Sequence, residues 1–60
     1  SAFLKKRLER HVKILKRKKS DLVIKQAERD YEKLKRLMPF MNEEERRNII
    51  DLRKQLDAMK

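Results

Sequence analysis

Four basic side chains in the first third of the chain recur at steps of four, three and four residues. They are Lys6, Arg10, Lys13 and Arg17. In an α-helix this spacing places them on one face, in a ridge about 16 Å long. A ridge of this kind can lie along a phosphate backbone, where each neutralised phosphate releases counterions. The sequence therefore predicts a helix that contacts a polyanion through charge.

The charge of the chain is concentrated around this ridge. Residues 1–19 hold nine bases and one acid, a net charge of +8, whereas residues 20–60 hold ten bases and nine acids, a net charge of +1. We include Lys16, Lys18 and Lys19 in the predicted anion-binding site. A block of like charge repels itself and indicates an anionic partner.

Nucleic acid is the polyanion that we expect, bound without regard to its base sequence. Apart from Arg, residues 2–19 offer no Asn, Gln or Ser, side chains that read base edges when a docked helix presents them together in the major groove. Phe3 is the only aromatic residue there, so we expect no stacking of single-stranded bases. Residues 16–19 are all Lys or Arg, as in short nuclear-import signals, which favours a nuclear over a cytoplasmic location inside the cell.

Other interpretations of the basic segment stay open. The lysines and arginines could be the solvated face of a longer coiled coil with a purely structural role. An acidic protein surface or an anionic lipid could replace nucleic acid as the partner. A calmodulin target or a membrane-surface helix is a further alternative, but the segment has no Trp, and we expect no membrane contact.

The elements that carry these residues are predicted to be helices. The chain has no Gly and a single proline, Pro39, and it is rich in residues that favour helices. Asn42 is a good N-cap, and Glu45 stands three residues later, as in a capping box. We therefore predict an all-α fold: an antiparallel helical hairpin with a long helix over about 2–38, a turn over 39–42 and a helix over about 43–59.

Apolar residues on both sides of that turn follow the a/d spacing of a heptad repeat. The predicted hairpin seam consists of Ile24, Ala27, Tyr31, Leu34, Met38, Ile49, Leu52, Leu56 and Met59. Folding the chain back at Pro39 pairs Leu34 with Leu52. This pattern is typical of a coiled-coil-like hairpin, which could also form oligomers.

A second apolar stripe lies upstream, and it consists of Leu4, Leu8, Val12, Leu15 and Leu22. On a continuous helix it would lie roughly 90–120° around the axis from the hairpin seam. We favour a continuous helix over a three-helix bundle broken near Ser20, because the segment has no Gly or Pro for a sharp reversal. The stripe is then uncovered, and we predict that it binds a partner helix or a second copy of the chain.

The 60 residues form one small unit, with 1–19 as a basic extension and 20–60 as the hairpin. A chain this short buries only about 60% of its unfolded surface, so a protein partner is expected, and the unit is expected to be a piece of a larger protein. With no Cys and a single His, His11, a four-ligand zinc site is excluded. No catalytic motif is recognisable, so we expect neither an enzyme nor a cofactor or metal, and His11 is predicted to be a solvated or interface side chain.

Overall fold

The computed structural model describes residues 2–60, which form three α-helices and a short 3₁₀-helix. The helices are α1 (Ala2–Arg17), α2 (Asp21–Leu37) and α3 (Glu43–Ala58), with the 3₁₀-helix η1 (Met38–Phe40) between α2 and α3. The predicted all-α fold class is confirmed. None of these helices is both long and apolar enough to cross a bilayer.

The continuous helix predicted over residues 2–38 is wrong, because residues 18–20 separate α1 from α2. Ser20 is extended, with φ −145° and ψ 122°, and its hydroxyl accepts a hydrogen bond from the Val23 N–H at 3.4 Å. Ser20 therefore caps the start of α2. No residue in 2–60 has a positive φ, so the reversal is built without the conformations that favour glycine.

Burial of the upstream stripe explains why the helix breaks. On one straight helix the stripe and the seam face different directions, whereas after the reversal both face a common core. The buried apolar side chains come from all three helices: Leu8, Val12, Leu15, Ile24, Ala27, Leu34, Ile49 and Leu56. Each buried leucine favours the folded state by about 1.5–3 kcal/mol, which outweighs a few helical hydrogen bonds lost at the break.

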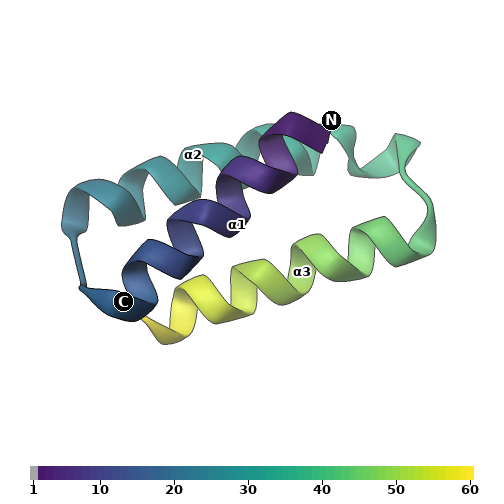
Figure 1. Cartoon of the computed structure of the whole chain (residues 1–60). Coiled ribbons are helices and arrows are strands. Elements are labelled where there is room, and N and C mark those ends of the chain that lie inside the picture. Colours follow the sequence, from purple (N-terminus) through teal and green to yellow (C-terminus); the bar gives the residue numbers. More distant parts are fainter. Residues whose placement is uncertain (1) are drawn as a thin grey trace.

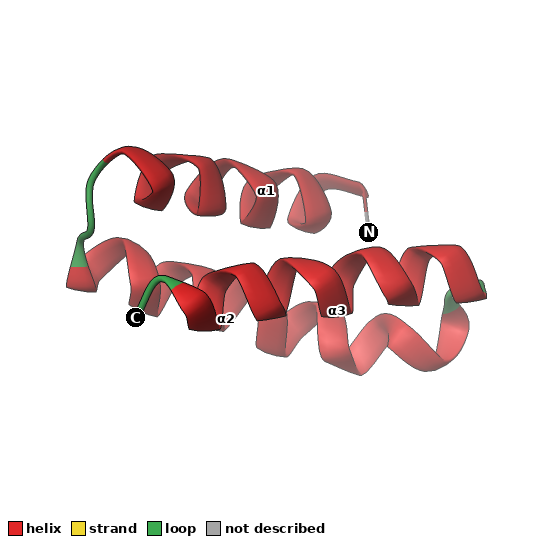
Figure 2. Cartoon of the chain, turned by 90° about the horizontal axis from the view of Figure 1, so that it is seen from below, coloured by secondary structure: helices red, strands yellow, loops and turns green. Residues whose placement is uncertain are grey.

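The three helices pack against one another in a bundle of 32 × 15 × 15 Å. Figure 1 shows α1 running toward the end of the molecule where α2 begins, and α3 returning beside α2 in the opposite direction. In Figure 2, α1 lies on one side of α2 and α3, with residues 18–20 at one end. The face of α1 opposite α2 and α3 is therefore open to solvent.

The turn between α2 and α3 is fixed by side chains that satisfy backbone groups. Asn42 Oδ1 accepts a hydrogen bond from the Glu45 N–H at 2.8 Å, as expected of the N-cap of α3. Arg46 Nη1 donates to the carbonyl of Met41 at 2.9 Å and to that of Met38 at 3.5 Å. The predicted start of the second helix after Asn42 is confirmed.

At the other end of α3, Lys60 connects that helix to α2. Lys60 Nζ lies 2.8 Å from Glu28 Oε2 and 3.2 Å from Asp57 Oδ1. The hydrogen bond from Lys60 lowers the pKa of both carboxyls, and the bond to Glu28, with that to Asp57, raises the pKa of Lys60. Arg53 pairs with Asp57 at 3.2 Å, and its guanidinium lies 4.9 Å from the centre of the Tyr31 ring.

Candidate anion-binding surface on the first helix

Every residue of the predicted anion-binding site is exposed, and we call this set the basic face. It consists of Lys6, Arg10, Lys13, Lys16 and Arg17 on α1 and of Lys18 and Lys19 directly after it. Within residues 2–60 none of them forms an ion pair. Exposed bases elsewhere in this range, such as Arg36 on α2 and Lys54 on α3, are unpaired as well, so the close spacing of the bases distinguishes the basic face. The charge of these seven side chains is therefore not neutralised by acids within residues 2–60.

The amphipathic pattern of α1 sets the direction of the basic face. Leu8, Val12 and Leu15 bury one side of the helix in the core, with 0%, 1% and 5% of their surface exposed. The bases fall at the helical positions between these residues, and so they project from the other side. The same burial that holds α1 in the bundle thus orients its charges toward solvent.

Two shallow hollows lie along the basic face and share Arg10. The first has a volume of about 390 Å³ and is lined by Phe3, Lys6, Arg7, Arg10 and His11. The second has a volume of about 420 Å³ and is lined by Arg10, Lys13, Ile14, Lys16 and Arg17. The surface therefore combines cations with two exposed apolar side chains, Phe3 and Ile14.

A buried ionic cluster lies beneath the first hollow. His11 Nδ1 and Asp30 Oδ2 are 2.7 Å apart, and Arg7 Nε lies 3.5 Å from Asp30 Oδ1. Asp30 is 3% exposed and His11 is 9% exposed. Of the two roles predicted for His11, it is therefore not a solvated side chain but one that lies between α1 and α2. The Asp30 carboxylate on α2 holds the Arg7 and His11 side chains of α1 in place. In one continuous helix Asp30 would be too far along the axis to contact either of them.

Sequence reasoning missed this cluster, although one signal was present. Asp30 recurs with Val23, Ala27 and Leu34 at steps of four, three and four, so a carboxylate stands in an apolar stripe. A buried carboxylate needs a cationic or hydrogen-bonding partner. Naming His11 and Arg7 as that partner required α1 to be docked against α2.

Comparisons with protein-family models, with curated proteins and with solved structures give no match. Chemically, residues 2–60 contain no group of three His, Asp or Glu side chains placed to hold a metal ion. What the surface of α1 does present is a row of cations suited to anionic oxygen atoms.

The predicted partner interface is largely inside the bundle. Leu8, Val12 and Leu15 are buried, and Leu4 is half-buried against the same core. The prediction that this stripe has nothing to cover it within the chain is wrong, because α2 and α3 cover it. Leu22, which is 66% exposed, is the member of the set that stays open to solvent.

The residues of the predicted hairpin seam all belong to the core or pack against it. Ile24, Ala27, Leu34, Ile49 and Leu56 are buried, and Tyr31, Met38, Leu52 and Met59 are partly buried against them. The seam residues therefore share the core with the stripe of α1 rather than forming a core of their own.

Proposed function

We propose that this chain is a non-enzymatic helical module that binds nucleic acid through the basic face of α1, without regard to base sequence. The observation that carries the proposal is the row of exposed bases on α1, none of them in an ion pair within residues 2–60. Cations that lack internal partners keep their full attraction for external phosphates.

The physical basis of binding is counterion release. The ridge Lys6, Arg10, Lys13 and Arg17 spans about 16 Å on one helix, a length over which a nucleic-acid strand presents several phosphates. Each phosphate contact contributes about 0.9 to the slope of log affinity against log salt on a duplex. The binding is then strong at low salt and weak at high salt, and it is similar for unrelated sequences.

Charge reversal on the basic face tests the proposal. We expect Arg10→Glu with Arg17→Glu to weaken duplex binding for unrelated sequences alike and to flatten the salt slope by about 0.9 for each lost contact. Both side chains are exposed, so the thermal stability should change little. Fluorescence anisotropy with a labelled duplex at several salt concentrations measures both effects.

The matched control is Arg36→Glu with Lys54→Glu. These residues are exposed on α2 and α3, neither forms an ion pair within residues 2–60, and the change in net charge is the same. The control should retain most of the binding. If both pairs weaken binding equally, net charge rather than the basic face is responsible. If the native chain does not bind at about 50 mM salt, nucleic-acid binding is wrong, and the result favours the alternative of a purely structural helical scaffold.

We also propose that the module associates with a protein partner or with a second copy of the chain. Leu22 and Ile50, which are 66% and 42% exposed, offer apolar surface for helix–helix association. Sedimentation over a range of concentrations tests self-association.

We further propose that α2 and α3 pair as a coiled-coil-like hairpin, with Leu34 opposite Leu52. Non-additive stability losses in a Leu34 and Leu52 double-mutant cycle test the pairing.

We also propose that the module works in the nucleus. Residues 16–19 end α1 and enter the turn, where all four side chains are exposed to an import receptor. The distribution of a fluorescent fusion in cells, compared with that of its Lys18→Ala, Lys19→Ala variant, tests this location.

A further inference from the structure

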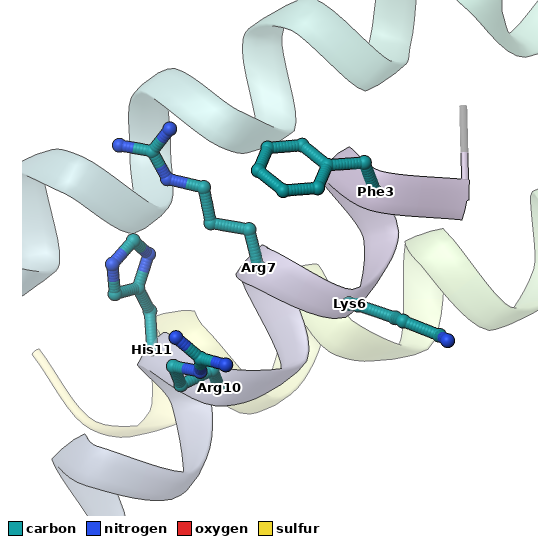
Figure 3. Close-up of a pocket in the computed structure, with 5 residues that line it drawn as sticks. All are labelled: Phe3, Lys6, Arg7, Arg10 and His11. Atoms are coloured by element: carbon teal, nitrogen blue, oxygen red, sulfur yellow. The ribbon is translucent and has the colours of Figure 1, made fainter.

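The first hollow of the basic face has a feature that phosphate contacts alone do not require. Phe3 exposes 72% of its surface there, beside the three cations Lys6, Arg7 and Arg10. In Figure 3 the Phe3 ring and the Arg7 side chain reach to the same side of α1, whereas Lys6 points away from them. An aromatic face next to guanidinium groups is suited to a ligand that is both planar and anionic.

One cation of this hollow, Arg7, is partly fixed before any ligand arrives. Asp30 pairs with Nε of Arg7 through one carboxylate oxygen and with His11 through the other. The pair with Nε directs the guanidinium while its terminal nitrogens form no ion pair within residues 2–60. A side chain that is already oriented loses less conformational entropy when it binds an anion.

A nucleotide supplies the two groups that this hollow is suited to bind. Its base offers a planar face for the ring of Phe3, and its phosphate offers oxygen atoms for Arg7 and Arg10. In a duplex the faces of the bases are covered by their neighbours, so only an unpaired nucleotide can present one.

We propose that the hollow lined by Phe3, Arg7 and Arg10 binds one unpaired nucleotide of a nucleic-acid strand, with the base stacked on Phe3 and the phosphate on the two arginines. This proposal rests on the proposed function and refines it, because it assigns a preference for single-stranded over duplex nucleic acid. It also replaces the expectation from the sequence that no base stacks on this segment, since Phe3 is exposed beside Arg7 and Arg10. One ring stacks one base of any type, so the site still does not read base sequence.

Substitution of Phe3 tests the site, and the chain contains a matched control. Phe40 is 86% exposed in η1, outside the basic face, so Phe40→Ala removes an equivalent aromatic ring elsewhere. The measurements are anisotropy titrations of the native chain, Phe3→Ala, Phe3→Leu and Phe40→Ala. The probes are a labelled mixed-sequence single strand and a blunt-ended duplex of that strand with its full complement, which has no unpaired loop. Both are used at about 50 mM salt, where charge contacts are strong.

We expect Phe3→Ala to weaken single-strand binding by about five- to a hundredfold, since that is the usual range for loss of one base–aromatic stack. Phe3→Leu should lose most of the same affinity, whereas duplex binding by both variants and all binding by Phe40→Ala should stay within about twofold of the native values. Melts by circular dichroism should show every variant folded, because both rings are exposed.

Two results would overturn the inference. If Phe3→Ala changes single-strand and duplex binding equally, or changes neither, the hollow does not hold an unpaired base, although binding through the basic face still stands. If the native chain binds neither probe, the proposed function itself fails, and this inference fails with it.

Discussion

At the scale of single residues, the pair His11 and Asp30 is the main polar contact inside the bundle. The two side chains come from α1 and α2, and both are buried. A buried carboxylate is tolerated because His11 and Arg7 compensate for the lost hydration. The pair therefore favours one way of docking α1 over alternatives that would leave Asp30 unpaired.

We expect Asp30→Leu to destabilise the chain by about 2–4 kcal/mol, because His11 then stays buried without its partner. The double variant His11→Leu with Asp30→Leu should recover much of this loss, since two apolar side chains can pack together. Urea unfolding followed by circular dichroism measures each free energy. Asp51→Leu, at an exposed position on α3, is the control and should change stability little. Strictly additive single effects would show that the two residues are not coupled.

At the scale of elements, two architectures differ in the position of α1. In a three-helix bundle α1 contributes to the core, whereas in a hairpin with a projecting extension it does not. Leu8 lies on α1 and is completely buried, as Leu34 is on α2. Leu8→Ala should therefore cost about 2–5 kcal/mol, as much as Leu34→Ala. Leu22→Ala, at a position 66% exposed, should cost under about 0.5 kcal/mol. Thermal melts of the three variants measure these losses of stability. A negligible loss of stability in Leu8→Ala would mean that α1 is not part of the core.

Some elements were predictable because their signals are local. The start of α3 depends on Asn42 and Glu45, which are close in sequence, and the basic face follows from periodicity within one helix. The break at residues 18–20 was not predictable in the same way. The cap at Ser20 is a weak local signal, and the break is decided by contacts that bury Leu8 and Leu15 against distant residues.

The same distinction applies to the candidate site. Its exposed bases were predicted from their spacing. The placement of Arg7 and His11 in the hollow beside Phe3 depends on Asp30, which lies 19 residues after His11 and meets it only when the helices dock. Neighbours of that kind cannot be read from a helical repeat.

At the scale of the whole molecule, the exposed contact of Lys60 with Glu28 on α2 makes a small part of the stability depend on pH. The lowered pKa values of Glu28 and Asp57 mean that their stabilising contribution is present above about pH 5. It is lost as the pH falls through those lowered values, because the carboxyls become neutral. The raised pKa of Lys60 means that its contribution is present below about pH 10 and is lost only as the pH rises through the raised value.

We therefore expect Lys60→Met to melt at a lower temperature than the native chain at neutral pH. The difference should disappear in strong acid, where Glu28 and Asp57 are protonated in both proteins. Lys54→Met, at an exposed position on α3 without an ion pair in residues 2–60, is the control. A difference between native and Lys60→Met that persists unchanged in acid would mean that packing of the aliphatic chain, not charge, is responsible.

Because α1 supplies both core residues and the basic face, folding and ligand occupancy are thermodynamically linked. Its crowded cations repel one another, and this repulsion opposes the folded state of the free chain. Under the proposed function, a bound polyanion would remove the repulsion and, by mass action, raise the melting temperature. Dissolved salt screens the same repulsion and stabilises the free chain, yet it weakens the complex. Ionic strength thus acts in opposite directions on the two states of one helix.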